Sequence, residues 1–474
     1  MKQKSKWLVF SLVGVAQFMV ILDVCITNMA LPAIKEALHF NTSSLQWVVT
    51  AYALAFGGFL LLGGRAADLF GRRRILVTGM VAFTVLSLLI GASSSSLMII
   101  ILRALQGVAA ALMSPAALSI VLTTFKEGAE RNRALGYWTI VSTGGAAIGL
   151  LLGGVLTQYA NWRWNFFINV PIGVVVAYAI AKIVPKHEQE AAHRDLDLPG
   201  ALLVTSGLIA FVYAISQAPT VGWLAGSTIG TIVLAAALIA GFLYNESRSK
   251  HPLMPLSIFK IRNVTGGNLV MAPVYAGQMG MFFLLSLYIQ DVMRYSPAQA
   301  GLAFLPFPIV LGLVSPRVSR WVSKHGYKRF LIVGPLVIAA TLLWLTRLTP
   351  TSSYWLDVLP TILLMPIGVG MTFMPTMAAA TSGVPGNEAG LASGLLNTSQ
   401  QMGGALGLAI LSGVAASVAA GTHGSPVAAL VHGYDRAFLV ASFMMMFAAL
   451  LAATVIKQQK RAKANHQVAV EAGM

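Results

Sequence analysis

Long stretches without charged residues recur along the whole chain and predict membrane-spanning helices. A helix needs about 20 mostly apolar residues to cross a bilayer, and stretches such as 37–64, 75–102 and 263–290 contain no Asp, Glu, Lys or Arg. The run 198–245 is long enough for two spans that turn near residues 217–222. The pattern predicts fourteen spans, at about 7–29, 45–65, 75–93, 97–121, 134–157, 164–184, 199–217, 225–245, 265–289, 297–318, 329–347, 356–379, 390–417 and 436–456.

The positive charges test this count, because Lys and Arg gather in the cytoplasmic segments of membrane proteins. With a cytoplasmic N-terminus, 26 of the 32 Lys and Arg fall on the cytoplasmic side and 5 on the outer side. Both tails are basic, so an even number of spans is expected. Fourteen is therefore favoured over thirteen or fifteen, with twelve as the main alternative. We expect a multi-pass protein of the plasma membrane with both termini in the cytoplasm.

Composition excludes the soluble classes of protein. Hydrophobic residues make up 57 % of the 474 residues and charged residues only 10 %, against about 25 % charged in ordinary globular domains. The topology accounts for most of the net charge of +17, so the expected partner is the lipid bilayer and not a nucleic acid. The single cysteine, Cys25, excludes an internal disulfide.

Motifs for ATP-driven or enzymatic chemistry are not found in the sequence. No G-x-x-x-x-G-K-[ST] phosphate-binding loop occurs, and H-E-x-x-H is absent. The Ser-His-Asp pattern of a hydrolase is not evident either. We therefore expect neither an enzyme nor a bound cofactor or metal.

Two pairs of similar segments suggest an internal duplication. Residues 71–74 resemble residues 326–329, and Gly145 and Gly149 match Gly403 and Gly407 at a similar offset. Repeated halves are common in transporters, although chance alignment in a Gly-rich chain is the alternative. The expected division is a first six-helix bundle over 1–184, two inserted spans over 185–264, a second bundle over 265–456 and a basic tail over 457–474.

Two charged residues are predicted to lie inside the membrane. Asp23 falls within the first span, and Arg103 lies near the start of the fourth. Charges at membrane depth are costly and usually paired, neutralised or in contact with water. Asp23 is a candidate for reversible proton binding, and Arg103, which stays charged, is a candidate for tuning it. The alternatives are a carboxylate in interfacial water and an arginine that extends to the outer headgroups.

A polar loop and a glycine stripe complete the candidate motifs. The cytoplasmic loop after the second span carries Gly64, Asp68, Gly71, Arg72 and Arg73, whose ion pairs could break and re-form between conformations. In the fifth span, glycines recur every four residues and therefore share one helix face. This face, a close packing surface that is either static or sliding, comprises Gly145, Gly149 and Gly153, followed by Gly154.

These motifs resemble the major facilitator superfamily, in its fourteen-span drug:proton antiporter group, over essentially the whole chain. The 64–73 loop resembles the cytoplasmic signature of the superfamily but has Leu69 where a basic residue is usual. The fifth span resembles the antiporter motif but has Leu150 where Pro is common. The resemblance implies an all-α membrane fold with two pseudo-symmetric six-helix bundles around a central cavity and two inserted helices.

The implied function is proton-coupled export of amphipathic small molecules by a monomer, with the proton as the only coupling ion. Asp23 and Arg103 would couple the proton, and the 64–73 loop would stabilise the outward-facing state. An uptake symporter and a non-transporting sensor are the alternatives. Candidate cavity residues are Gln17, Tyr52, Gln106, Trp138, Gln278, Asn397 and Gln401.

The acidic residues of the second half bear on the substrate. Asp291 and Asp357 are expected near the outer ends of their spans, and Asp435 is expected to start the last span. With no acidic residue well inside this half, dicationic substrates are disfavoured. Neutral, zwitterionic or monocationic compounds are expected instead.

Overall fold

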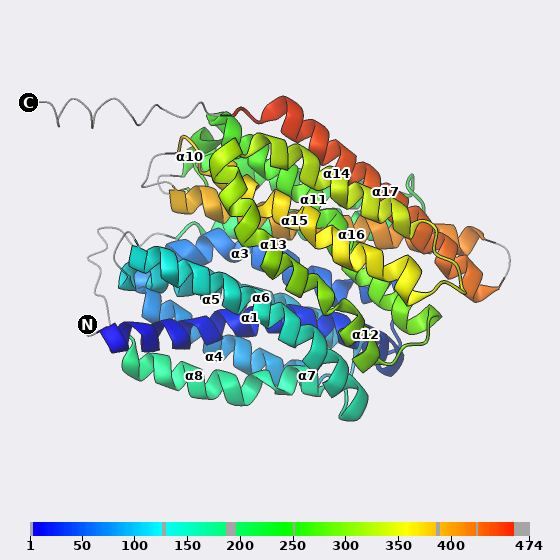
Figure 1. The fold of residues 1–474 in the computed structure, drawn as a ribbon, viewed down its shortest axis with the longest axis horizontal. Helices are drawn as coiled ribbons and strands as arrows, with labels where there is room; N and C mark the ends of the chain where they lie inside the picture. The colour runs from blue at the N-terminus through cyan, green and yellow to red at the C-terminus, as the bar shows by residue number, and fades with distance from the viewer. Residues whose placement is uncertain are drawn as a thin grey trace, which may run out of the picture.

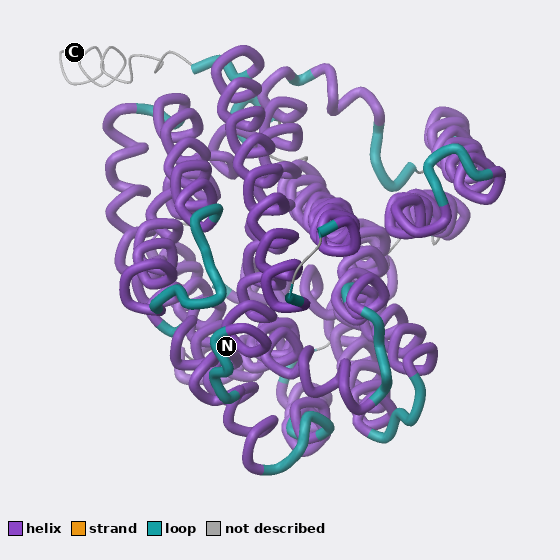
Figure 2. The backbone as a smooth tube through the Cα atoms, turned by 90° about the vertical axis from the view of Figure 1, so that its right-hand side faces the viewer, coloured by secondary structure: helices purple, strands orange, loops and turns teal. Residues whose placement is uncertain are grey.

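The computed structural model describes residues 3–125, 129–185, 196–249, 252–384, 389–422 and 425–458, and in these segments it contains helices and loops only (Figure 2). Fourteen helical segments are long and apolar enough to cross a membrane. In lipid, a helix satisfies its own backbone hydrogen bonds, which explains why long apolar runs fold this way. The predicted fourteen-span, all-α fold is confirmed.

The first group of helices lies in the lower part of Figure 1 and packs around a core that includes Met80, Phe83 and Met113. α3 packs against α5, α1 against α6, and α4 against both α5 and α8. The helices of this group are α1 (Gln3–Ala37), the short α2 (Thr42–Leu45), α3 (Trp47–Phe70), α4 (Arg72–Gly91), α5 (Ser96–Thr124), α6 (Ala129–Tyr159), α7 (Trp164–Phe167) and α8 (Asn169–Ile183).

The second group lies in the upper part of Figure 1 and is built by matching contacts. α11 packs against α16, and α14 packs against both α15 and α17. Its helices are α11 (Arg262–Leu287), α12 (Pro297–Phe304), α13 (Pro306–His325), α14 (Lys328–Leu345), α15 (Leu359–Ala380), α16 (Ala389–Gly421) and α17 (Pro426–Val455). π-helical turns at Tyr288–Val292 and Tyr354–Val358 extend α11 and precede α15.

Two further helices, α9 (Leu198–Val221) and α10 (Gly226–Arg248), lie between the groups in sequence. α9 packs against α3 of the first group and α16 of the second, and α10 packs mainly against α9. A short 3-10 helix, Leu256–Lys260, follows them. The predicted connection at 185–198 and the basic tail at 457–474 lie mostly outside the described residues.

The last span begins earlier than the sequence suggested. The predicted start was residue 436, but α17 begins at Pro426, where the Ser425 hydroxyl caps the helix by accepting a hydrogen bond from the Ala428 amide. Ser at the cap followed by Pro is a favourable helix start. Asp435 is therefore nine residues inside α17 and not at its start, which corrects the prediction.

The two groups contain similar glycine contacts. Gly149 of α6 packs against Leu22 and Cys25 of α1, and Gly407 of α16 packs against Ala276 of α11. The chain also turns between α3 and α4 at Gly71, with φ of 94°, and between α13 and α14 at Gly326, with φ of 80°. Positive φ favours glycine, so the same turn recurs at the same place in both groups. This recurrence supports the proposal of an internal duplication.

Candidate functional site

Asp23 lies inside the first helical group, at the centre of a polar cluster. Its side chain is completely buried. One carboxylate oxygen accepts hydrogen bonds from the Gln106 amide of α5 at 3.0 Å and the Asn169 amide of α8 at 3.1 Å. The other oxygen forms an ion pair with the Arg103 guanidinium. This burial rules out the alternative of a carboxylate in interfacial water.

Arg103 is held from several sides and is only 1 % exposed. Its Nε donates to the carbonyl of Val48 at 3.0 Å, and Nη1 also donates to Gln106 Oε1 at 2.6 Å. The guanidinium carbon lies 4.4 Å from the ring centroid of Tyr52, a cation–π distance. Arg103 therefore points into the bundle and does not extend to the headgroups, which removes the second alternative.

The arrangement makes Asp23 and Arg103 mutually dependent. Two opposite charges that are buried together are tolerated because they neutralise each other, and removing one leaves an uncompensated charge. Asp23 could take up a proton, whereas Arg103 stays charged. Without the Asp23 charge, the guanidinium would keep only the acceptors that it already contacts, Gln106 Oε1 and the Val48 carbonyl. The cluster is therefore a buried, hydrogen-bonded ion pair to which α1, α5 and α8 contribute.

Two members of the cluster were not predicted as site residues. Asn169 of α8 and Ser87 of α4, which accepts a hydrogen bond from Gln106 at 2.9 Å, are not among the candidates from the sequence. Gln106 itself was predicted to face the substrate, and the structure places it beside Asp23. A polar residue in an apolar span was the only available signal for Ser87.

Residues 64–73, predicted as a loop, lie at the end of α3 and the start of α4 with only Gly71 between the two helices, and their described contacts stay within the first group. Asp68 pairs with Arg72 at 3.5 Å, and the Asp68 side chain is 57 % exposed. Arg73 donates to the carbonyls of Val184, at 3.0 Å, and Ala181, at the end of α8. Gly64 lies near Pro115 of α5. Among the described residues, the loop therefore braces α3, α4 and α8.

The glycine stripe of α6 faces two partners. Gly145 packs against Phe18, Gly149 against Cys25 and Gly153 against Ile26, all on α1. Gly154 turns toward Pro297 and Ala298 of α12, in the other group. The neighbouring Leu150, where the antiporter motif commonly has Pro, contacts Gly301 of α12 and is also buried.

The seven predicted cavity residues are found in different environments. Gln106 and Tyr52 belong to the Asp23 cluster, Trp138 packs on the core of the first group, Gln401 lies against Gly57, and Asn397 is exposed. Twelve buried side-chain polar atoms have no hydrogen-bond partner among the described residues. Such atoms call for a water or ligand partner. Three of the twelve belong to predicted cavity residues: Gln17 Oε1, Tyr52 Oη and Gln278 Oε1.

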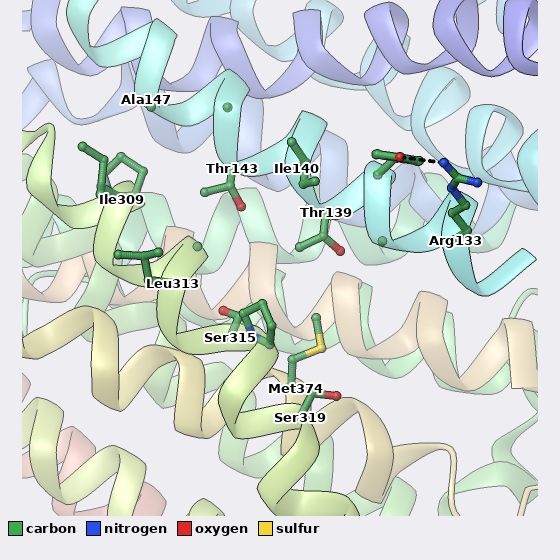
Figure 3. Close-up of a pocket in the computed structure, with 16 residues that line it drawn as sticks. Arg133, Thr139, Ile140, Thr143, Ala147, Ile309, Leu313, Ser315, Ser319 and Met374 are labelled. Atoms are coloured by element: carbon green, nitrogen blue, oxygen red, sulfur yellow. Dashed lines mark hydrogen bonds between the residues drawn. The ribbon is translucent and has the colours of Figure 1, made fainter. Parts of the chain in front are cut away.

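A separate cavity of about 820 Å³ lies between α6 and α13, with Met374 of α15 at its base (Figure 3). Arg133 is at one end, and Thr139, Ile140 and Thr143 of α6 face Ile309 and Leu313 of α13 (Figure 3). None of the seven predicted residues lines it. The volume falls in the usual range for small-molecule pockets, about 300–1,000 Å³.

The two helical groups are in contact near the C-terminal end of α1. The Ser286 hydroxyl of α11 donates to the Asn28 carbonyl at 3.3 Å, and Lys35 pairs with Asp291 at 3.8 Å. Nearby, the Ala298 amide of α12 donates to Gln158 of α6 at 3.2 Å. At this end α1 and α6 contact the second group, whereas the cavity between α6 and α13 lies toward the opposite end.

Similar proteins were found at the level of sequence. The chain is 39 % identical to the puromycin resistance protein pur8 of Streptomyces alboniger over 96 % of this chain and 92 % of that protein. It is 41 % identical to the cephamycin export protein CmcT of Amycolatopsis lactamdurans, over 92 % of this chain and 90 % of that one. The tetracenomycin C resistance and export protein of Streptomyces glaucescens is 34 % identical, over 87 % and 76 %.

Solved structures show the same fold. A bacterial homologue of the lysosomal transporter Spinster, in an inward-facing and occupied conformation, superimposes with a TM-score of 0.71 at 14 % identity, covering 98 % of this chain and 100 % of that chain. The xylose transporter XylE from E. coli gives a TM-score of 0.64 at 14 % identity, over 96 % and 98 %. The sequence model of the Major Facilitator Superfamily matches residues 13–408. The chain therefore belongs to the Major Facilitator Superfamily, a family of membrane transporters and not of enzymes, and its relatives include antibiotic resistance and export proteins.

Proposed function

We propose that this protein exports amphipathic small molecules from the cytoplasm in exchange for protons. The main observation in support of this proposal is the ion pair of Asp23 and Arg103. The pair is buried in the first bundle and hydrogen-bonded to Gln106 and Asn169. A charged pair is costly at this depth, and a functional requirement for a proton acceptor explains its presence. The similarity to resistance and export proteins supports the direction of transport.

The distribution of contacts supports an inward-facing state. Lys and Arg are concentrated at the end of the spans that carries the N-terminus, and we infer that this end is cytoplasmic and that both termini lie there. The bundles are joined at the opposite end by Ser286 with Asn28 and by Lys35 with Asp291. The cavity between α6 and α13 then opens toward the cytoplasmic half.

The transport cycle follows from these positions. Substrate enters from the cytoplasm, and the bundles rock to break the Lys35–Asp291 contact and open the outer side. A proton from outside neutralises Asp23 and loosens its hold on Arg103. We propose that Asp68, Arg72 and Arg73 close the cytoplasmic side in that state. The substrate leaves to the outside, the protonated protein returns to the inward-facing form, and the proton then leaves to the cytoplasm and restores the ion pair. Both bundles belong to one chain, so a monomer suffices.

A resistance profile tests the direction and the substrate class. An exporter-deficient bacterial host producing the protein should tolerate higher concentrations of some compounds in a panel that includes puromycin, cephamycins and simple cationic dyes. Asp23→Asn at equal membrane abundance should remove that protection. Sensitisation in place of protection would support the uptake alternative, and no change across a broad panel would contradict export.

A further inference from the structure

The two faces along which the bundles meet are unequal. Along α3 and α16 they are tightly packed: a Cβ built on Gly57 would lie 2.8 Å from Cβ of Gln401. The inserted helix α9 covers this face, since Gln46 donates to Ser216 of α9 at 2.7 Å and accepts from Ser412 of α16. The first group, the second group and α9 therefore close the α3–α16 face together.

The opposite face, between α6 and α13, is open over half its length. Gln158 and the Ala298 amide join the helices α6 and α12 at one end, and the 820 Å³ cavity separates α6 from α13 toward the other (Figure 3). A Cβ built on Gly144 of α6 would meet no atom within 4 Å. Access between the bundles is thus concentrated on this side of the molecule.

The chemistry of the lining restricts what this cavity would hold. Most of the lining is apolar, with hydroxyls from Thr139, Thr143, Ser315 and Ser319. Arg133 is the only ionisable group other than Tyr137 among the described residues that line it. A cavity with a cation and no carboxylate attracts anionic groups and repels cations.

Arg133 has no counter-charge within the described part of the chain. Its Nη2 donates to Tyr137 Oη at 3.3 Å (Figure 3), and the guanidinium lies 5.8 Å from the Trp7 ring. The nearby carboxylate of Glu130 is already paired with Lys6 at 3.1 Å. Arg133 is exposed, and its guanidinium, beside two aromatic rings and without a carboxylate partner, can form charge-assisted hydrogen bonds with a carboxylate or sulfonate.

We propose that the α6–α13 cavity binds amphipathic molecules that carry an anionic group, with that group against Arg133 and the apolar body between α6 and α13. Zwitterions fit this description, and simple cations do not, which narrows the expectation from sequence. The proposal rests on the proposed export function because it names the substrate class. The occupant is a small molecule from the cytoplasm and not a membrane lipid.

Binding of two related fluorescent probes tests the assignment without any transport. The purified full chain in nanodiscs of phosphatidylcholine is titrated with anionic 8-anilinonaphthalene-1-sulfonate and with neutral N-phenyl-1-naphthylamine, after subtraction of empty nanodiscs. Arg133→Gln should weaken binding of the anionic probe at least fivefold and change the neutral probe less than twofold. Gly144→Trp, which fills the cavity, should weaken both probes at least fivefold.

The matched control is Arg317→Gln on α13. Arg317 donates to the Leu313 carbonyl at 2.6 Å and is outside the lining, so this variant removes the same charge and should leave both affinities within twofold. The proposal is overturned if Arg133→Gln leaves the anionic probe unaffected, or if the control is equally damaging. It is also overturned if phosphatidylglycerol in the nanodiscs displaces the anionic probe from the wild type but not from Arg133→Gln, because the site would then hold lipid.

The probe-binding test of the cavity and the transport test of proton-coupled export can fail independently. Asp68→Asn, which is expected to slow transport, should retain anionic probe binding, because Asp68 is not in the lining. Proton-driven export together with no role for Arg133 would refute the cavity assignment alone. Selective probe binding without proton-driven transport would refute the coupling alone.

Discussion

At the scale of single residues, the account depends on an asymmetry between Asp23 and Arg103. A buried carboxyl group can become neutral by taking up a proton, whereas a buried arginine cannot lose its charge. Loss of Asp23 therefore leaves Arg103 uncompensated, with hydrogen bonds to Val48 and Gln106 only. Loss of Arg103 leaves a carboxyl that escapes the penalty by protonation. The two single substitutions are not equivalent.

This asymmetry predicts an order of stabilities. Asp23→Asn should lower the free energy of unfolding by about 3–5 kcal/mol, the usual cost of breaking a buried pair. Arg103→Gln should cost less, and the double variant Asp23→Asn/Arg103→Gln should be more stable than Asp23→Asn alone. Thermal unfolding of the purified proteins in one detergent provides the ranking. Equal losses for both single variants, with additive loss in the double variant, would contradict the pairing.

A second residue-scale prediction concerns glycine packing on α6. A Cβ built on Gly149 would lie 2.8 Å from Cβ of Cys25, whereas one on Gly144 would meet nothing. Gly149→Ala should therefore lower the melting temperature, since overpacking costs about 1–3 kcal/mol. Gly144→Ala, five residues away on the same helix, serves as the matched control and should leave the melting temperature unchanged or raise it. Equal effects would mean that α1 and α6 are not in close contact.

The sequence predicted the membrane-depth charges but not their environment. Asp23 and Arg103 stood out because their flanking residues are apolar, yet they are 80 positions apart and their pairing depends on how α1 packs against α5. The contribution of Asn169 was hidden for the same reason, because a side-chain amide carries no mark of its distant partner. The residue types therefore identify the candidates, but only the packing of the helices shows which of them are in contact.

At the scale of elements, span number was predictable and span ends were not. Apolar length decides whether a helix crosses a bilayer, and the described chain has the fourteen candidates expected. The start of α17 was misplaced because Asp435 and Arg436 look like a loop boundary. The local signal that decides it is the Ser425 cap followed by Pro426.

The 64–73 loop offers an element-scale prediction about conformational balance. The Asp68–Arg72 pair is exposed, and exposed pairs contribute about 0–1 kcal/mol to stability. Asp68→Asn should therefore leave unfolding and substrate binding nearly unchanged while slowing transport, because the carboxylate is proposed to act only when the cytoplasmic side closes. Transport rate and binding affinity, measured on the same reconstituted protein, separate these effects. A loss of affinity that matches the loss of transport would contradict this role.

At the scale of the whole molecule, the account requires the two bundles to separate on the outer side. Lys35 of α1 and Asp291, in the π-helical turn after α11, bridge them there at 3.8 Å. The division into two bundles was suggested by the repeated motifs, whereas the location of the open cavity was not predictable. Which face opens depends on the conformational state and on where α9 and α10 dock, and neither is encoded in span hydropathy.

Cross-linking the outer contact should stop transport. In a Cys25→Ser background, Lys35→Cys/Asp291→Cys treated with a short bismaleimide should lose export, because the outer side cannot open. Each single-cysteine protein treated in the same way serves as the control and should keep its rate. Undiminished export by fully cross-linked protein would rule out outer opening between α1 and α11.

The most direct test of the central claim is uphill transport in inside-out membrane vesicles with an acidified lumen. The account predicts that wild-type protein accumulates a substrate found in the resistance screen, and that nigericin, which collapses the pH gradient, releases it. The folded double variant Asp23→Asn/Arg103→Gln should show no accumulation, because the proton acceptor is gone. Gradient-dependent accumulation by that variant would place the proton elsewhere, and wild-type accumulation that nigericin does not affect would contradict proton-coupled export.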